Sequence, residues 1–283
     1  MLKSYLVGSV IREIRKRKGL RQATIQNLDF DNHDSQTTLS RIENLKQDPT
    51  QNTISELLSR IGLPHEEFFC PFLETQDADT FALNHQISFL LDRAEGNESI
   101  QSLAQDLIEK LKSKLDMQSI INKQLWISLK TRLNAIAGNN IEETLELVKE
   151  GILLTYPEFD EKTFDGDMLI FCEGELLLTS AICYSKLGNT SNAIEILSRT
   201  IVGWSKLPFN EFRKDTLLCQ LRNTLTQMYL DIGDYDTALT SSDEGLAIAK
   251  REARKAFMPN AVYLRGLAIF YANGGIGKKV KHI

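Results

Sequence analysis

The sequence predicts an all-α protein with a small N-terminal domain and a longer array of paired helices. Apolar residues recur at helical spacing along the 283 residues, and six prolines make long extended segments unlikely. Glycines followed by Asn or Asp recur in the longer, C-terminal part, where they separate similar segments. We therefore expect an N-terminal domain over residues 1–65, a linker over 66–78 and a repeat domain over 79–283.

Four short helices are expected in the N-terminal domain. The segment "VGSVIREIRKRKGL" has apolar residues at near-helical spacing and ends at Gly19, a helix stop. The segment "RQATIQNL" forms a second helix, and a polar turn leads to a third that is capped by Asp34 or Ser35. A fourth follows in "DPTQNTISELLSRIGL", and two such helices joined by a tight turn form a helix-turn-helix domain. Predicted inward residues include Ile11, Ile25, Leu57 and Ile61.

The third helix has an unusual polar face. A surface helix usually carries Lys and Glu on its outside, because they favour helix and solubility. Here the outward positions are Gln36, Thr37, Ser40 and Arg41, opposite Leu39 and Ile42. Such polar side chains hydrogen-bond to base edges and phosphates. The pattern fits a major-groove face, and an ordinary capped helix with a solvated side is the alternative.

Two N-terminal motifs resemble the lambda-repressor-like (Xre-type) DNA-binding family. They are "IREIRKRKGLRQ" and "LSRIENLKQDP", which match its I-R-x-x-R-x-x-x-G-L-x-Q and S-R-I-E-x-x-x-x-x-P patterns. The resemblance spans Val7 to about Leu63 and implies a lambda-repressor-like helix-turn-helix domain. It also favours the major-groove interpretation of the third helix.

This resemblance implies a role for individual residues. Gln22 opens the second helix and holds a backbone phosphate, and Arg15 pairs with Glu43, tying the first helix to the third. The remaining positions implied to bind DNA are Gln36, Thr37 and Arg41 at the bases, with Thr38 and Ser40 near the backbone.

The charge distribution singles out the same end of the chain. Residues 1–62 carry ten Lys or Arg and seven Asp or Glu, a net charge of +3, whereas the remainder has a net charge of −8. Five of the bases fall within residues 12–18. A basic end on an acidic chain indicates that this end alone meets a polyanion.

Composition and cysteine usage indicate the compartment. Hydrophobic residues make up 42% of the chain and charged residues 25%, as in globular proteins. The four cysteines are scattered and form no C-x-x-C pair, which favours reduced thiols over a disulfide or zinc framework. The N-terminus turns basic after a short apolar run, the reverse of a secretory signal, and no apolar run approaches bilayer length. We expect a soluble, cytoplasmic protein that does not enter membranes.

Internal repeats organise the C-terminal part. "AICYSKLGNTSNAIEILSRTI" and "TQMYLDIGDYDTALTSSDEGL" align without gaps, 45 residues apart, and weaker copies surround Gly96, Gly138 and Gly275. The Gly and the following Asn or Asp suit a tight turn, the Tyr packs between helices, and the small Ala lets the second helix approach the first. This pattern resembles the tetratricopeptide repeat, which implies an α-solenoid with a concave groove.

One predicted first helix carries a candidate ligand-binding stripe. Its members are Gln220, Asn223 and Gln227, which recur at i, i+3 and i+7 opposite Leu218, Leu221 and Leu225. An amide side chain both donates and accepts, so it can hold a peptide through the peptide backbone. We expect Asn223 to lie outside the core. A merely solvated face is the alternative.

An Xre-type domain followed by about five degenerate repeats resembles the Rgg/PlcR family of regulators. The resemblance covers nearly the whole chain. It implies a homodimeric, cytoplasmic quorum-sensing regulator of transcription that binds a short signalling peptide in the repeat groove. Asn223 lies six residues before the repeat Tyr, where PlcR-type proteins carry a peptide-clamping Asn, and Arg265 at the equivalent place one repeat later suits a peptide carboxylate. A dimer with one recognition helix per subunit is expected to bind an inverted-repeat operator in double-stranded DNA.

Catalytic motifs are absent from the sequence. The four His are isolated, and there is no P-loop, G-x-S-x-G or G-x-G-x-x-G arrangement. We expect no enzyme, no metal site and no cofactor. A DNA-binding protein whose repeats dock a partner protein instead of a peptide remains open, as does a scaffold that has lost DNA binding.

Overall fold

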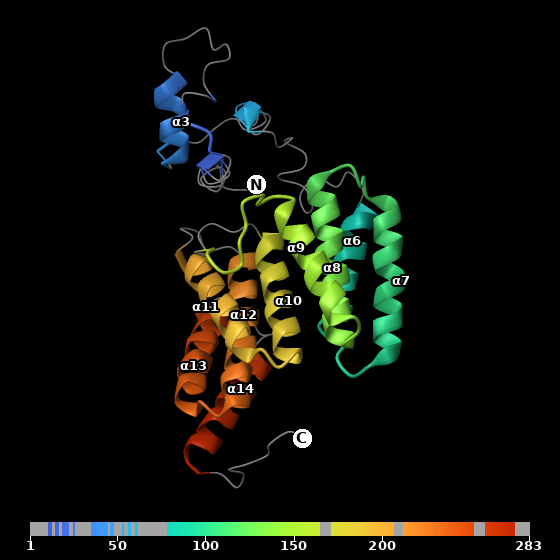
Figure 1. The fold of residues 1–283 in the computed structure, drawn as a ribbon, viewed down its shortest axis with the longest axis vertical. Coiled ribbons are helices and arrows are strands. Elements are labelled where there is room, and N and C mark those ends of the chain that lie inside the picture. The colour runs from blue at the N-terminus through green and yellow to red at the C-terminus, as the bar shows by residue number, and fades with distance from the viewer. Residues whose placement is uncertain are drawn as a thin grey trace. The chain divides into compact units, whose positions relative to one another are not determined.

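Regular structure in this protein is helical. The computed structural model describes residues 11–12, 15–16, 19–22, 25, 35–44, 46–47, 53, 56–57, 60–61, 78–164, 171–206, 212–251 and 258–274. Within these ranges the chain forms helices and turns and no strand, which confirms the all-α prediction (Figure 1). The helices span Ser35–Glu43 (α3), Ala78–Leu91 (α6), Glu98–Lys114 (α7), Ile120–Ala137 (α8), Ile141–Leu153 (α9), Phe171–Lys186 (α10), Thr190–Lys206 (α11), Phe212–Ile232 (α12), Tyr235–Arg251 (α13) and Met258–Ala272 (α14).

The chain divides into two compact units. The first comprises residues 1–133 and 151–159, and the second comprises residues 134–150 and 160–283. Helix α6 begins at Ala78, one residue before the predicted start of the repeat domain. The predicted boundary at residue 65 and the linker up to residue 77 lie outside the described residues, so these domain limits stay a prediction.

Apolar burial shapes the N-terminal segment. Leu39 and Ile42 on one side of α3 are 2% and 1% exposed. A fully buried Leu or Ile side chain contributes about 1.5–3 kcal/mol relative to an exposed one, so this face anchors α3. The predicted inward residues of the neighbouring segments are also buried, namely Ile11, Ile25, Leu57 and Ile61.

A buried amide stabilises the first unit, in which α6 and α7 pack against each other. Gln124 of α8 donates from Nε2 to the carbonyl oxygen of Gly151 at 2.9 Å and to Thr155 Oγ1 at 2.7 Å. These bonds join α8 to the 151–159 segment of the same unit. Because Gln124 is fully buried, losing either partner would leave a donor unsatisfied.

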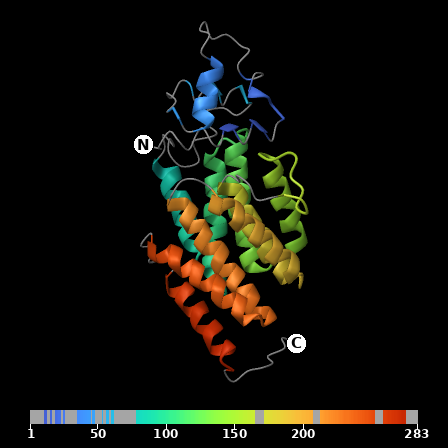
Figure 2. The same cartoon turned by 90° about the vertical axis from the view of Figure 1, so that its left-hand side faces the viewer.

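The helices of the second unit pack in chain order. Each of α10 to α13 contacts the next, and α12 also contacts α10 and α14 (Figures 1 and 2). Tight turns join α10 to α11 and α12 to α13, so each pair is antiparallel. This is the array of helix pairs that the repeated sequence predicts.

The predicted turn glycines adopt the left-handed conformation. Gly96, Gly138, Gly188 and Gly233 have φ between +68° and +82°, a region that residues with a Cβ rarely enter. The residue that follows caps the next helix in three of these turns. The caps are Asn97, Asn189 and Asp234, whose side-chain oxygens accept from the N–H of Ile100, Asn192 and Thr237.

The fifth predicted turn lies at the edge of the described residues. Gly274, with φ +79°, follows the end of α14. Gly275, the predicted turn glycine, lies outside the described residues. The turn at Gly275 therefore stays a prediction.

The repeat Ala residues belong to the core, as predicted, and the repeat Tyr residues are half-buried. Ala193 and Ala238 are fully buried. Tyr229 and Tyr271 pack against a buried cluster that contains Ala238, and the ring of Tyr271 stacks on that of Tyr235 with centroids 5.3 Å apart. The small Ala side chains let paired helices approach, and the aromatic rings fill the space between them.

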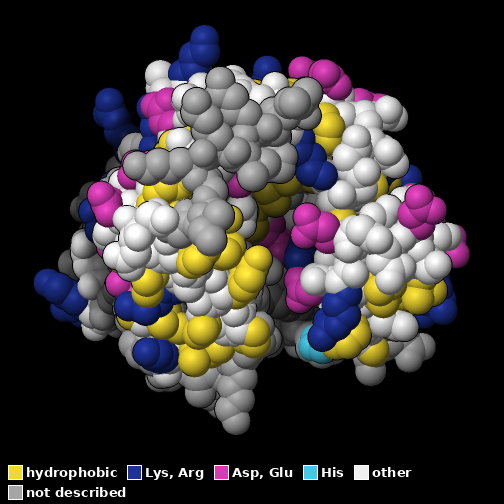
Figure 3. Space-filling model, turned by 90° about the horizontal axis from the view of Figure 1, so that it is seen from below, with side chains coloured by type: hydrophobic (Ala, Val, Ile, Leu, Met, Phe, Trp, Pro, Cys, Tyr) yellow, Lys and Arg dark blue, Asp and Glu magenta, His cyan; other side chains and the backbone are white. Residues whose placement is uncertain are grey.

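The surface combines polar and apolar side chains. Figure 3 shows hydrophobic side chains reaching the surface at several places between charged ones. The exposed large hydrophobic residues include Val262, Tyr263 and Phe270 of α14. Among the described helices, none is both long enough and apolar enough to cross a membrane. The described residues also contain no group of three or more His, Cys, Asp or Glu that could hold a metal ion.

Candidate functional site

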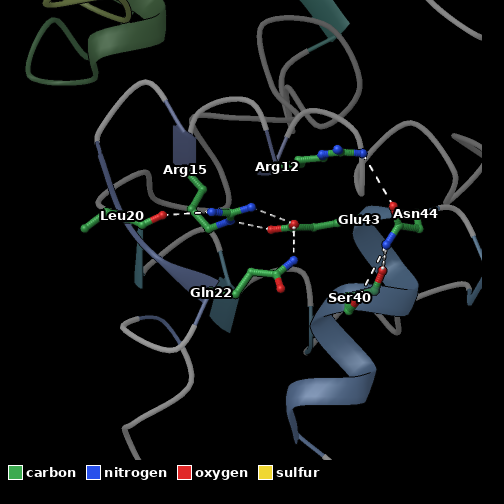
Figure 4. A network of polar contacts seen from close by, with 7 residues as sticks. All are labelled: Arg12, Arg15, Leu20, Gln22, Ser40, Glu43 and Asn44. Carbon is green, nitrogen blue, oxygen red and sulfur yellow. Dashed lines mark hydrogen bonds and ion pairs between the residues drawn. The ribbon is translucent and has the colours of Figure 1, made fainter.

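A buried ion pair connects the first helical segment, described at residues 11–12 and 15–16, to the end of α3 (Figure 4). Arg15 donates from Nε to Glu43 Oε1 at 2.6 Å and from Nη2 to Glu43 Oε2 at 2.8 Å. The two residues are 9% and 3% exposed. Arg15 also donates from Nη1 to the carbonyl oxygen of Leu20 at 2.8 Å. Buried charges persist only when paired and hydrogen-bonded, so this pair, which the resemblance implies, holds the two segments together.

Gln22 joins the same network. Its Nε2 donates to Glu43 Oε2 at 2.6 Å (Figure 4). The family resemblance implied a phosphate contact for Gln22, and this bond to Glu43 was not predicted. Because an amide nitrogen carries two N–H groups, the bond to Glu43 orients Gln22 and leaves it a second donor.

The exposed side of α3 agrees with the predicted division of its faces. Arg41 is exposed, Thr38 and Ser40 are half-buried, and Leu39 and Ile42 are buried. Gln36 and Thr37 lie in the first turn of α3, and their side chains are outside the description. An exposed guanidinium offers two parallel donors, which is the geometry that a guanine edge or a phosphate accepts.

Asn44 links the end of α3 to the first helical segment. Its Nδ2 donates to the carbonyl oxygen of Ser40 at 2.7 Å, and its Oδ1 accepts from Arg12 Nη1 at 3.4 Å (Figure 4). From the sequence, Arg12 was expected only as part of a basic run. The signal that would have singled it out is its spacing, one helical turn before Lys16 and three residues before Arg15.

The predicted stripe on α12 is exposed only in part. Gln227 is exposed and Gln220 is half-buried, but Asn223 is 7% exposed, contrary to the expectation that it lies outside the core. A Cβ on Gly245 of α13 would lie 3.7 Å from Asn223 Oδ1, so this side of α12 is covered by α13. The face that reaches solvent runs instead through Gln220, Thr224, Gln227 and Asp231.

Arg265, the other predicted peptide contact, is engaged within the second unit. Its Nε pairs with Asp243 of α13, and the two side chains are 40% and 51% exposed. The adjacent Glu244 pairs with Arg222 of α12 at 2.5 Å. Neighbouring carboxylates of α13 thus hold arginines from α12 and α14. A ligand carboxylate at Arg265 would compete with Asp243.

Another polar cluster holds the described part of the connection between α9 and α10. Tyr184 donates its hydroxyl to Glu161 Oε2 at 3.1 Å, and Arg199 donates to the carbonyl oxygen of Lys162 at 2.6 Å. Burial raises the pKa of the Glu161 carboxyl above its ordinary value, and burial together with the Glu161 charge raises the pKa of Tyr184 to about 12. The Tyr184 hydroxyl therefore stays protonated and acts as a hydrogen-bond donor.

No protein-family model matches the sequence, and no curated protein matches it significantly. The arrangement of helices is nevertheless shared with a solved all-helical structure. That structure is Bacillus thuringiensis PlcR in complex with the peptide PapR7 and DNA, with a TM-score of 0.56 and 14% identity over 94% of this chain and 88% of that chain. The similarity bears out, for the fold, the resemblance to the Rgg/PlcR family. ComR from S. thermophilus in complex with DNA and its signalling peptide ComS matches at a TM-score of 0.37 and 14% identity, over 93% of this chain and 99% of that chain, and carries no further weight.

Proposed function

We propose that this chain is a DNA-binding regulator of transcription whose operator binding or activity is controlled by a short signalling peptide bound to its repeats. The observation that carries the proposal is the Arg15–Glu43–Gln22 network, which holds α3 against the first helical segment. The shared fold with PlcR, solved with both a peptide and DNA, supports both halves of the proposal.

On the DNA side, α3 is the proposed recognition helix. Its buried face is anchored by Leu39 and Ile42, which leaves Arg41 exposed for a base edge. Gln36 and Thr37 are proposed to read bases with it, and Thr38 and Ser40 to lie near the backbone. Gln22 uses its second amide N–H for a phosphate, while Glu43 fixes its orientation.

The proposed assembly is a cytoplasmic homodimer on an inverted repeat. One recognition helix reads about half a helical turn of major groove, so a two-fold dimer doubles the length of the site and adds a second set of contacts to the binding free energy. The chain acts by binding, without catalysis, cofactor or metal.

On the peptide side, the proposed contacts are Gln220, Asn223, Gln227 and Arg265. Gln227 is the most accessible amide, although its Nε2 donates to Asp231 at 2.8 Å. Asn223 contributes from the edge of the stripe, where only a small part of its side chain reaches solvent. Arg265 receives a peptide carboxylate by exchanging it for Asp243.

The DNA half is tested by selecting duplexes from a random pool with the full-length protein and measuring affinity by fluorescence anisotropy. Arg41→Ala should weaken specific binding by about 1–3 kcal/mol per half-site while sparing random duplex. Lys250→Gln, an exposed charge change on α13, serves as the control. Equal losses on selected and random duplex would restrict Arg41 to phosphate contact.

The peptide half is tested by calorimetry with synthetic peptides encoded beside the gene. Asn223→Ala should weaken binding by about 1–3 kcal/mol, or roughly ten- to hundred-fold, because a peptide amide loses its partner. Since Asn223 is buried, the melting temperature of the free variant must be measured alongside, with Gln227→Ala as an exposed comparison. Unchanged affinity would remove Asn223 from the site.

A second candidate function is docking of a partner protein on the repeats. The observation that favours it is the outer side of α14, where Val262, Tyr263 and Phe270 are 51%, 61% and 50% exposed. Exposed aromatic and aliphatic side chains are typical of protein interfaces. Selective DNA binding by wild type, together with no binding of any locally encoded peptide, would favour this candidate.

A further inference from the structure

An indole ring in the first unit has two ammonium groups beside it. Lys112 Nζ, in the last turn of α7, lies 4.1 Å from the centroid of the Trp126 ring on α8. Lys130 Nζ, one helical turn further along α8, lies 5.0 Å from the same centroid. All three residues are half-buried, and together they form what we call the Trp126 cluster. The proposed DNA and peptide contacts use none of them.

No carboxylate among the described residues pairs with either ammonium group. The carboxylates one turn on either side of Lys112 are Glu109 and Asp116, and both are hydrogen-bonded elsewhere. Lys130 has no acidic residue one turn away in either direction. Because each Nζ lies close to one centroid, the two like charges are less than about 10 Å apart, the Debye length at 0.1 M salt, and they repel each other.

The indole N–H is a further donor at this point. Trp126 Nε1 is buried, and no atom in the described part of the chain accepts from it. Indole and ammonium groups can donate hydrogen bonds but cannot accept them, and an indole face attracts a cation without neutralising it. The Trp126 cluster therefore gathers positive charge and donors, and an anionic acceptor is the group that would satisfy them.

The chain around the cluster is basic, although this part of the protein is acidic. Residues 110–132 contain six Lys or Arg and one Asp, whereas residues 63–283 as a whole have a net charge of −8. Among these six cations, Arg132 is already paired with Asp92 at 2.5 Å. The excess of positive charge attracts an anion from a distance, and the Trp126 cluster is the point at which two cations converge.

We propose that the Trp126 cluster docks an acidic segment of a partner protein, with Lys112 and Lys130 pairing with its carboxylates. A nucleic acid is the less suitable anion, because its backbone is held by a longer row of cations and its phosphates favour the guanidinium fork over an ammonium group. Two lysines beside an aromatic ring suit one or two carboxylates and the protein surface that carries them. This docking does not depend on the proposed function.

The test uses Trp126 of the full-length protein as the reporter. Trp204, the other tryptophan, is 4% exposed and is therefore shielded from an added ligand. Acetylated and amidated hexaglutamate supplies side-chain carboxylates alone, and hexaglutamine of the same length is the neutral probe. Hexaglutamate should change the tryptophan emission saturably at about 50 mM KCl, where charge is weakly screened, and hexaglutamine should not. Trp126→Phe should abolish the change.

Charge variants locate the contact. Lys112→Gln and Lys130→Gln should each weaken hexaglutamate binding about five-fold, and the double variant about 25-fold, because each ammonium group pairs with a carboxylate. Lys110→Gln makes the same charge change at an exposed position two residues away on α7, so it should leave the affinity as in wild type. Lys112→Arg keeps the charge and should retain binding. Equal melting temperatures of wild type and the Gln variants would show that the losses do not come from unfolding.

Four outcomes would overturn the proposal. No saturable change with hexaglutamate at about 50 mM KCl would show that the cluster only packs α7 against α8. Equal losses in Lys110→Gln and Lys112→Gln would reduce the binding to general charge. A single-stranded oligonucleotide of equal charge that binds more tightly than hexaglutamate, and is weakened by Lys112→Gln, would reassign the cluster to nucleic acid. A fall in the oligomeric mass of the double variant would reassign it to a second copy of this chain.

Discussion

The N-terminal segment and the second unit place their Arg–carboxylate pairs in opposite environments. The side chains of Arg15 and Glu43 are 11% and 1% exposed, whereas those of Arg265 and Asp243 are 40% and 51% exposed. Breaking a buried pair leaves a charge without water or a partner, but an exposed pair is replaced by hydration at little cost. The geometry of the described N-terminal residues therefore depends on the buried Arg15–Glu43 pair, whereas the second unit does not depend on its exposed Arg265–Asp243 pair in this way.

In the second unit, close packing of side chains fixes the geometry of the helices. Gly174 of α10 lies where α11 and α12 converge, and a Cβ at this position would lie 2.6 Å from Leu217 Cδ2 and 2.8 Å from Trp204 Nε1. Such distances are well inside van der Waals contact, so only glycine fits without displacement of a neighbour. The structure of the N-terminal segment is thus specified by a buried charge pair, and that of the second unit by the shapes of closely packed side chains.

The largest expected effect comes from breaking the buried pair. Glu43→Ala should destabilise the N-terminal segment by about 3–5 kcal/mol, because Arg15 is left buried and unpaired. Hydrogen exchange of α3 amides in the full-length protein measures the change locally. Gln22→Ala, which keeps the pair, should cost only about 0.5–1.5 kcal/mol. Unaltered protection of α3 in Glu43→Ala would show that the pair contributes no stability.

Filling the space at Gly174 should have the next largest effect. Gly174→Ala is expected to destabilise the second unit by about 1–3 kcal/mol through overpacking against Trp204 and Leu217. Gly266→Ala in α14 is the matched control, because nothing lies within 4 Å of its added Cβ. That variant should gain about 0.5–1 kcal/mol from helix propensity. Denaturant unfolding measures both, and equal stabilisation would refute the close approach at Gly174.

The exposed pair should contribute little. Arg265→Gln, Asp243→Asn and the double variant should each change the free energy of unfolding by less than about 1 kcal/mol. A double-mutant cycle should give a coupling of about 0.2–1 kcal/mol that disappears in high salt. A coupling as large as that of the buried pair would end the contrast between the two regions.

The smallest effect concerns the pH dependence of the second unit. Burial raises the pKa of Glu161 above its ordinary value of 4.5, so the folded state retains a proton that the unfolded state loses as pH rises through that value. The free energy of unfolding should fall over this window, and Glu161→Gln should remove the fall, a difference within about 0.5 kcal/mol. Melting curves between about pH 4 and 7 test this, with the exposed Glu158→Gln as control. A variant that follows wild type across the window would exclude Glu161 as the cause.

The sequence was informative wherever the interactions are local. Gly188 and Gly233 were placed in turns because a left-handed residue between two helices is a property of a few neighbouring residues. The burial of Leu39 and Ile42 followed from helical periodicity alone. The Arg15–Glu43 pair joins residues 28 positions apart, and it was reached through a family motif because no local rule connects such distant residues.

Tertiary structure decided which face of each helix its neighbours cover. Gln220, Asn223 and Gln227 share a side of α12 by periodicity, but α13 covers the edge that holds Asn223. Thr224 and Asp231 reach solvent on this helix where Asn223 does not. The basic run at residues 12–18 predicted a polyanion partner, yet only the fold showed that Glu43 binds Arg15 and Gln22, whereas no carboxylate among the described residues pairs with Lys16 or Arg21. Sequence alone determined α3, the turns at Gly188 and Gly233 and the basic end, because these depend on spacing and composition. Exposure and charge compensation depend on contacts between distant segments, so they were settled only by the packed structure.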